Sequence, residues 1–337
     1  MASSATTDTL TATGLPQTVA GLTKVHPLYS TWAPVWRSLA HVYDGSGGFL
    51  SGTYLVAHPR EWIDHTQENP TKPTKKLKAR RKLARYENIA SPIIDMKLAA
   101  LFRQEPVRKS GDGQSDAELA HPYLLWCEDV DGTGTCMDDF MKEAWRLAAI
   151  FGFVYLYMDR AAGPAPVSMA DQQPPVLRMY TPLDAPDWLV DTQGQLTAVK
   201  FVEPVPRTSL EEDGSVTDSQ CRYVTETEWW VEGADGVAQP KMPHAFGQLP
   251  VVVLYSGKKG LQQVIGDSVL RDPKLFIDLY NLTSEIRELL RNQTFGLMNV
   301  PLGTGDTAVG VEVVKTWNSG EKGTDDVFFS PGPDRKS

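Results

Sequence analysis

The stretch at residues 138–159, DDFMKEAWRLAAIFGFVYLYMD, joins a helical pattern to a strand pattern through one glycine. Acidic residues at its start lie where a helix dipole favours negative charge, and apolar residues then recur at helical spacing. Gly152 is a residue common at helix ends, and the aromatic run after it is typical of a buried strand. We therefore expect a helix over 138–150 and a strand over 153–159. The expected buried stripe of this helix contains Phe140, Ala144, Leu147 and Phe151.

Beyond this unit, from residue 165 to 255, the apolar pattern shifts towards the alternation of β-strands. Turn-like sequences separate the runs, so we expect an antiparallel meander. The expected strands are 176–181, 188–191, 196–203, 222–231 and 250–255. In the fourth strand, one face should carry Tyr223, Thr225, Thr227, Trp229 and Val231.

Three further segments predict helices. Residues 32–43 form a short one, with Trp36, Leu39 and Tyr43 on one face. Residues 85–106 form a second, in which Pro92 should bend the helix or start a new one. Its stripe contains Ile89, Ile93, Met96, Ala100 and Leu101. Residues 265–295 form the longest, and we expect its wide apolar stripe to be buried. That stripe contains Leu275, Leu279, Leu282, Ile286, Leu289 and Leu290.

Charge is distributed unevenly along the chain. Eight of the fourteen residues from 72 to 85 are Lys or Arg, directly before the second helix. This run indicates either a surface for a polyanion or acidic partner, or an ordinary solvated helical face. The formal net charge of −9 argues against a generic nucleic-acid coat, which would be basic.

Composition excludes several classes of protein. The chain of 337 residues is long enough for a real core, and no apolar run approaches the roughly 20 residues that span a bilayer. Residues 1–22 have neither the basic start nor the apolar centre of a secretory signal, and we expect a loosely ordered arm there. Three cysteines without CxxC spacing favour free thiols over disulfides or a zinc site.

Motifs of catalysis or cofactor binding are absent from the sequence, and we expect no cofactor and no enzymatic activity. There is no phosphate-binding glycine loop and no nucleophile elbow. Asp138 and Asp139 could form a metal pair for nuclease chemistry, but an acidic helix start explains them more simply. His244 is expected to cap or pack. Trp229 and Trp230 should point to opposite faces of a strand, so they cannot form one stacking platform.

Five segments in order resemble the portal proteins of tailed bacteriophages. They are the helix at 85–106, the helix–glycine–strand unit ending AAIFGFVYLYMD at 148–159, the stretch at 180–201, HAFGQLPVV at 244–252, and the helix at 270–286. The resemblance covers roughly residues 80–300. It implies an α+β fold with a helical and antiparallel-sheet wing, one long stem helix and a small mixed clip. The implied domains are an arm and peripheral wing segment (1–70), the wing (71–262), the stem helix (263–296) and an incomplete clip (297–337).

The resemblance also implies a function. The chain would be one subunit of a homo-oligomeric ring of about twelve copies at the capsid vertex, the head-tail connector through which DNA is packaged and ejected. Its partners would be the terminase motor, neck or adaptor proteins, scaffold, major capsid protein and double-stranded DNA without sequence specificity, with no membrane. It would reside in the virion, and in the host cytoplasm during assembly. Lys274, Arg287 and Arg291 are the candidate DNA-channel residues, against the alternative of charge compensation at a helix end.

One part of the family pattern is missing. Portal chains continue from the clip into a second stem helix, a tunnel loop and another long helix, and we expect these to be lacking here. Two other functions stay open: a phage or prophage DNA-processing enzyme, a metal-dependent nuclease using Asp138, Asp139 or Asp159, and a head-completion adaptor.

Overall fold

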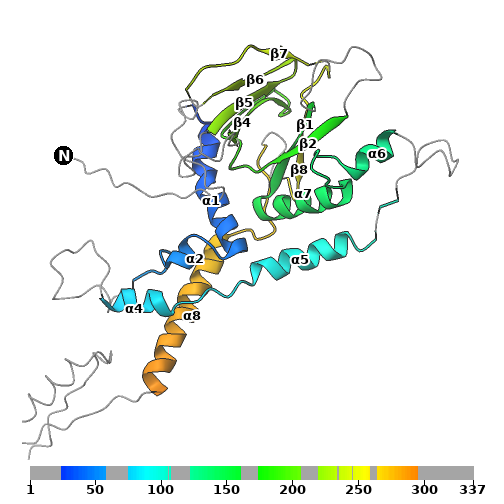
Figure 1. The fold of residues 1–337 in the computed structure, drawn as a ribbon. Helices are drawn as coiled ribbons and strands as arrows, with labels where there is room; N and C mark the ends of the chain where they lie inside the picture. Colours follow the sequence, from blue (N-terminus) through cyan, green and yellow to red (C-terminus); the bar gives the residue numbers. More distant parts are fainter. Residues whose placement is uncertain are drawn as a thin grey trace, which may run out of the picture. The chain divides into compact units, whose positions relative to one another are not determined.

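The computed structural model describes residues 24–57, 75–104, 106–107, 122–160, 174–205, 219–233, 235–244, 246–258 and 264–294 (Figure 1). Helices and antiparallel sheets make up the fold, so the α+β class is confirmed. The chain divides into two compact units. One contains the residues up to Leu55 together with 86–278, and the other contains 56–85 and the residues from Leu279 onward.

The helix–glycine–strand unit is confirmed. Helix α7 (Met137–Phe151) ends at Gly152, whose backbone adopts φ 95° and whose N–H donates to the Ala148 carbonyl at 2.7 Å. Strand β1 (Phe153–Arg160) follows at once. Phe140, Ala144 and Phe151 are buried as predicted, and Leu147 is half-buried. Because one glycine reverses the chain, β1 runs back along α7.

Strand β1 is the centre of a three-stranded antiparallel sheet with the order β2-β1-β8. Its neighbours are β2 (Pro175–Tyr180) and β8 (Val251–Tyr255), and both flank Tyr155 in the register. Helix α7 covers one face of this sheet (Figure 1), where Ala144 and Ala148 pack on Val154. Leu156, Met179 and Leu254 extend this contact. The predicted single meander is therefore wrong, because β2 and β8 pair with β1 and not with the strands predicted at 188–191, 196–203 and 222–231.

A five-stranded antiparallel sheet contains the remaining strands in sequence order. They are β3 (Asp187–Val190), β4 (Leu196–Pro204), β5 (Ser219–Thr225), β6 (Glu228–Glu232) and β7 (Met242–Pro243). The predicted strand at 222–231 is wrong, because it is a hairpin of β5 and β6. The Thr225 hydroxyl oxygen accepts the Glu228 N–H at 3.0 Å and closes the turn. The hairpin places Tyr223 opposite Trp230, with stacked rings 4.9 Å apart, so Tyr223 and Trp229 lie on different faces.

Aromatic side chains fill the space between the two sheets. Tyr155 of β1 and Phe201 of β4 are both fully buried, with ring centroids 5.7 Å apart. Tyr180 stacks on Phe201 at 4.0 Å. Helix α1 (Pro27–Asp44) is longer than predicted and adds Trp36, which meets the Phe153 ring edge-on at 5.7 Å. Leu39 is buried as well, as predicted.

Two short helices and two helices near the basic run complete the described fold before the last helix. Their bounds are α2 (Gly48–Ser51), α6 (Pro122–Glu128), α4 (Lys75–Leu83) and α5 (Ala90–Leu101). The predicted helix over 85–106 is shorter at both ends, because residues 84–89 are not helical and α5 ends at Leu101. The Asn88 side chain accepts the Ser91 N–H at 3.0 Å and starts α5. Pro92 lies in the first turn of α5, where the backbone N–H groups have no partner within the helix and proline is tolerated. This position agrees with the predicted alternative that Pro92 starts a new helix.

Helix α8 (Pro273–Thr294) begins eight residues later than the predicted start at 265. The preceding segment packs instead on the end of α7, where the Ser268 hydroxyl donates to the Ile150 carbonyl at 2.6 Å. Ile265 is fully buried there. The Asp272 carboxylate then accepts the Lys274 N–H at 2.9 Å, and Pro273 takes the position where helices favour proline. Helical periodicity assigned residues 265–272 to this helix, but their packing on α7 keeps them out of it.

Two predictions lie outside the described residues: the N-terminal arm at 1–22 and the incomplete clip at 297–337. Across the part of the chain that is described, no helix combines the length and apolarity that crossing a membrane requires.

Candidate functional site

The three predicted DNA-channel residues are not gathered into one cluster. Lys274 is exposed in the first turn of α8, whereas Arg287 is half-buried and donates to the Arg85 carbonyl at 3.2 Å. The side chain of Arg291 lies outside the described residues. On a regular helix, Lys274 and Arg287 are about 140° apart around the axis and about 20 Å apart along it. Of the three predicted channel residues, Lys274 is therefore the one that the structure places as an exposed cation.

Part of the basic run before α5 has a structural role. Arg80 of α4 is only 3% exposed and forms an ion pair with Glu285 of α8 at 3.7 Å. Its guanidinium also donates to the Val56 carbonyl, and the Asn281 side chain accepts the Val56 N–H at 2.8 Å. These contacts join α4 to α8 within one unit. Exposed basic residues remain on α4 and directly after it, namely Lys78, Lys82 and Arg85.

Helix α8 exposes the apolar residues that we expected to be buried. Tyr280 and Ser284, the buried side chains among the described residues 273–290 of this helix, lie on the opposite side. The expectation of burial is therefore wrong for a single copy of the chain, because α4 contacts the other face. The exposed fractions are 65% for Leu275, 38% for Leu279, 53% for Leu282, 45% for Ile286, 60% for Leu289 and 56% for Leu290.

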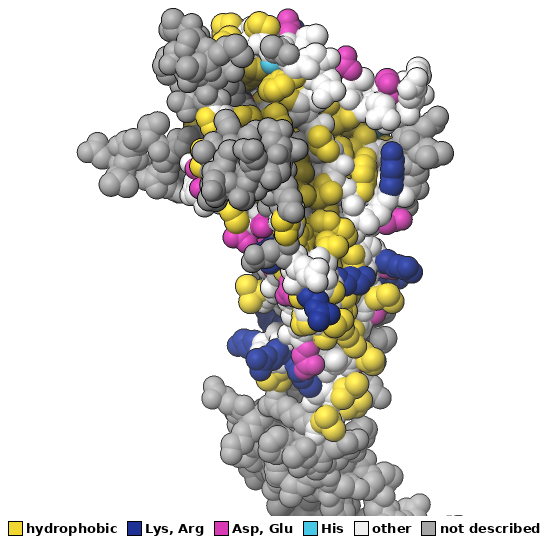
Figure 2. Space-filling model, turned by 90° about the vertical axis from the view of Figure 1, so that its right-hand side faces the viewer, with side chains coloured by type: hydrophobic (Ala, Val, Ile, Leu, Met, Phe, Trp, Pro, Cys, Tyr) yellow, Lys and Arg dark blue, Asp and Glu magenta, His cyan; other side chains and the backbone are white. Residues whose placement is uncertain are grey.

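The first five of these residues fall within about 80° around the axis, and we call them the α8 stripe. Figure 2 shows hydrophobic side chains at the surface of the part that contains α8, next to Lys and Arg side chains. Soluble monomers rarely expose large contiguous apolar patches, so such a stripe is typical of a protein–protein contact.

A second apolar helix face is exposed on α5. Ile94 and Ala90 are buried, and α5 packs on α7 through this side. The residues of the predicted stripe are exposed, so this helix is buried on one side only. Four of these residues fall within about 60° around the axis, and we call them the α5 stripe: Ile89, Ile93, Met96 and Ala100. Leu101 is also exposed, but it lies on the same side of the helix as Ala90 and Ile94.

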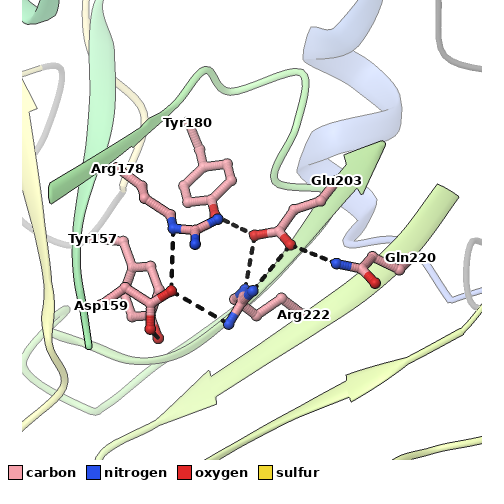
Figure 3. Close-up of polar contacts among 7 residues, drawn as sticks. All are labelled: Tyr157, Asp159, Arg178, Tyr180, Glu203, Gln220 and Arg222. Atoms are coloured by element: carbon pink, nitrogen blue, oxygen red, sulfur yellow. Dashed lines mark hydrogen bonds and ion pairs between the residues drawn. The ribbon is translucent and has the colours of Figure 1, made fainter. Parts of the chain in front are cut away.

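A network of charged and polar side chains lies between the two sheets, with Asp159, Glu203 and Arg222 buried and Arg178 exposed (Figure 3). Glu203 of β4 receives two N–H donors from Arg222 of β5, at 2.7 and 3.2 Å. Arg222 also approaches Asp159 of β1 at 3.6 Å, and Arg178 of β2 lies 3.1 Å from the same carboxylate. The remaining members are Tyr157, Tyr180 and Gln220, each of which donates to one of the two carboxylates.

The electrostatics of this network favour its charged form. Burial pushes the pKa of Glu203 upward, but the hydrogen bonds and charge of Arg222, with those of Tyr180 and Gln220, outweigh burial and lower it. Burial works against the cation of Arg222, yet Glu203 and Asp159 raise its pKa above the usual range. Burial, and then Glu203, raise the pKa of Tyr180, which therefore stays a neutral donor. The network is a closed set of ion pairs that joins the sheets.

The structure separates the carboxylates of the predicted nuclease site. Asp138 and Asp139 lie in the first turn of α7, and Asp139 pairs with Lys142 at 3.1 Å. Asp159 shares a strand face with Tyr157, which is the face turned away from α7. Within the described residues, no group of three or more His, Cys, Asp or Glu side chains is arranged to hold a metal ion.

Trp229, Trp230 and His244 take packing positions. Arg222 lies over the Trp229 ring at 5.3 Å and Lys241 over the Trp230 ring at 4.6 Å, so the two indoles face opposite ways, as predicted. The His244 ring contacts the Thr225 carbonyl at 2.9 Å. This contact at the end of the β5–β6 hairpin agrees with the expected packing role.

Comparison with known proteins adds no assignment. The sequence matches no protein-family model and no curated protein. Geometry therefore carries the functional argument, and the α8 stripe, the α5 stripe and Lys274 are the exposed features that need an explanation.

Proposed function

We propose that this chain is a subunit of the portal ring of a tailed bacteriophage, a non-enzymatic protein that surrounds a passage for double-stranded DNA. Two kinds of support converge on this proposal. The five ordered segments of the sequence resemble portal proteins, and the helix equivalent to their stem is a long helix with an exposed apolar stripe. In the proposed ring, terminase, neck, scaffold and capsid proteins would dock on the outer surfaces.

The α8 stripe is the observation that carries the proposal. Its five aliphatic side chains are between 38% and 65% exposed, although each would be stabilised by burial. Removing apolar surface from water contributes about 25 cal/mol per Å². A neighbouring copy would cover the stripe and gain this free energy, whereas an isolated chain leaves it in water.

The charge of the chain agrees with a passage through which DNA slides. The net charge of −9 disfavours tight binding to phosphates, which would stall movement. In the proposed ring, exposed Lys274 would touch the DNA backbone without reading bases, as phosphate contacts do. Arg287 would take the same role only if its contact with the Arg85 carbonyl were released.

Mass photometry and negative-stain microscopy of the purified chain at micromolar concentration test the proposal. We expect closed rings of about twelve subunits, as the resemblance implies. A strict monomer under these conditions would contradict the proposal. Leu282→Glu, which places a charge in the α8 stripe, should abolish the rings, and Lys78→Glu on the exposed side of α4 is the matched control that should keep them.

A packaging assay tests the role of Lys274 separately. Lys274→Ala should leave the circular-dichroism spectrum and the ring unchanged, because the side chain is exposed. It should alter the amount of DNA packaged per capsid. Unchanged packaging would leave Lys274 with only a helix-start role.

A further inference from the structure

We propose that the α8 stripe of one copy docks on the α5 stripe of the next copy, so that these two helices form the repeating contact of the assembly. This inference rests on the proposed ring and deepens it, because it names the two surfaces that meet. The occupant of each stripe is a second copy of this chain.

Symmetry explains why two different stripes are needed. In a ring of more than two copies, the contact is head-to-tail, so each copy offers two different patches. A stripe that paired with itself would be consumed in a two-fold dimer and could not continue around a ring. The α8 stripe therefore needs a counter-surface elsewhere on the chain.

The α5 stripe has the properties of this counter-surface. Met96 is 69% exposed and Ile93 is 38% exposed, and both lie on a regular helix. From Ile89 to Ala100 the stripe is about 17 Å long, against about 21 Å from Leu275 to Leu289 on α8. Two apolar helical faces of similar length can pack ridge into groove. Other exposed apolar side chains on the described helices, such as Leu50 of α2, Leu83 of α4 and Leu125 of α6, lie on helices of nine residues or fewer, which are too short for a stripe of this length.

The charges beside the two stripes are complementary. Lys97 is exposed on α5, about 40° around the axis from Ile93. Asp278 is exposed on α8, about 20° from Leu289 and next to Leu275 and Leu282. Opposite charges at the rim of an apolar contact fix its register and suppress wrong pairings. The contact would thus have an apolar centre and at least one ion pair at its edge.

Cysteine cross-linking tests the pairing directly. The variants Met96→Cys and Leu282→Cys would be made singly and together in a Cys136→Ser background, because Cys136 is the half-buried native thiol and Cys127 and Cys221 are buried. With a short bis-maleimide, the double variant should give a ladder of covalent oligomers on a denaturing gel. A mixture of the two single variants should give dimers, and each single variant alone should give none.

Each alternative has its own result. Dimers from Leu282→Cys alone would mean that α8 pairs with α8. Cross-linking of the double variant only within the monomer would mean that the stripes pair inside one chain. Rings by mass photometry without any cross-link would overturn the pairing and leave the ring intact. Monomers alone would contradict the proposed function itself.

Charge reversal gives an independent test by mass photometry. Lys97→Glu or Asp278→Lys should each weaken association by about two- to fivefold per contact, the range for exposed ion pairs. The combined variant should recover most of the loss, because the pair is restored with opposite polarity. Lys78→Glu is the control and should have no effect. Two single losses that simply add in the combined variant would show that the two side chains do not meet.

Discussion

The guanidinium of Arg222 forms a bidentate hydrogen-bonded pair with the carboxylate of Glu203, with Nε to Oε1 at 2.7 Å and Nη2 to Oε2 at 3.2 Å. Both side chains are less than 10% exposed, and the same guanidinium approaches Asp159 in the other sheet at 3.6 Å. One arginine therefore connects β5, β4 and β1 across the space between the two sheets (Figure 3).

Replacing Arg222 by methionine should destabilise the protein strongly. The change preserves much of the side-chain volume but leaves Glu203 and Asp159 buried with less compensation, which typically costs about 3–5 kcal/mol. Equilibrium unfolding in urea measures the loss. Lys142→Ala breaks the exposed pair with Asp139 and is the control, which should leave the midpoint unchanged. An Arg222→Met midpoint equal to that of the unmodified chain would contradict this role.

The network should also make stability depend on pH. Because the folded-state pKa of Glu203 is lowered, its contribution is fully present above the ordinary value of about 4.5 and is lost as the pH falls through the folded pKa. Unfolding free energies measured between pH 7 and pH 3 should therefore decline on the acid side, and less steeply in Glu203→Gln. Asp184 contributes to the pH dependence of stability with the opposite sign. Burial raises its pKa, so its protonation at low pH favours the folded state. Identical slopes for the two proteins would contradict the prediction.

Gly152 should tolerate no side chain. Its φ of 95° is costly for other residues, and a Cβ there would collide with the backbone of Gly266. Gly134 is a matched control, with φ 92° and no atom within 4 Å of a Cβ. Gly134→Ala should lose roughly 1–2 kcal/mol for the left-handed backbone alone. Gly152→Ala should lose clearly more in the same thermal or urea unfolding experiment, and equal losses would mean that the segment at 266–270 moves away freely.

Leu282 and Leu39 should respond differently to truncation. Leu39 is 2% exposed, so Leu39→Ala should destabilise the folded chain by about 2–5 kcal/mol. Leu282 is 53% exposed, so Leu282→Ala should change the unfolding of an isolated chain little. It should instead weaken assembly, seen as a lower fraction of rings at equal concentration in mass photometry. A large loss of monomer stability in Leu282→Ala would show that the stripe is covered within the chain.

The purified protein should not cleave plasmid DNA when Mg²⁺ or Mn²⁺ is added. Asp138 and Asp139 start a helix, and Asp159 faces the other way in ion pairs with Arg178 and Arg222, so the three carboxylates do not converge. Agarose gels of supercoiled plasmid provide the measurement. Metal-dependent nicking that disappears in Asp138→Ala or Asp139→Ala would overturn the non-enzymatic interpretation.

Local pattern was sufficient where one element decides its own conformation. Residues 137–160 show this best, because helical spacing, a helix-ending glycine and an aromatic run act within a few residues of one another. The hairpin of β5 and β6 was missed because its turn, Glu226–Thr227, contains neither glycine nor asparagine, and the alternation runs through it. The start of α8 was missed because Ser268 bonds to the end of α7, far away in the sequence.

The sequence by itself determined which residues of α5 and α8 share an apolar face, because helix periodicity depends only on spacing. Whether these faces are covered was decided by tertiary structure. Helix α7 packs on α5 beside the α5 stripe, and Arg80 of α4 pairs with Glu285 of α8 away from the α8 stripe. The ion-pair network was likewise beyond the sequence. Asp159, Glu203 and Arg222 stand on three strands, and only strand register and sheet packing bring their charges within bonding distance, where burial makes their pairing obligatory.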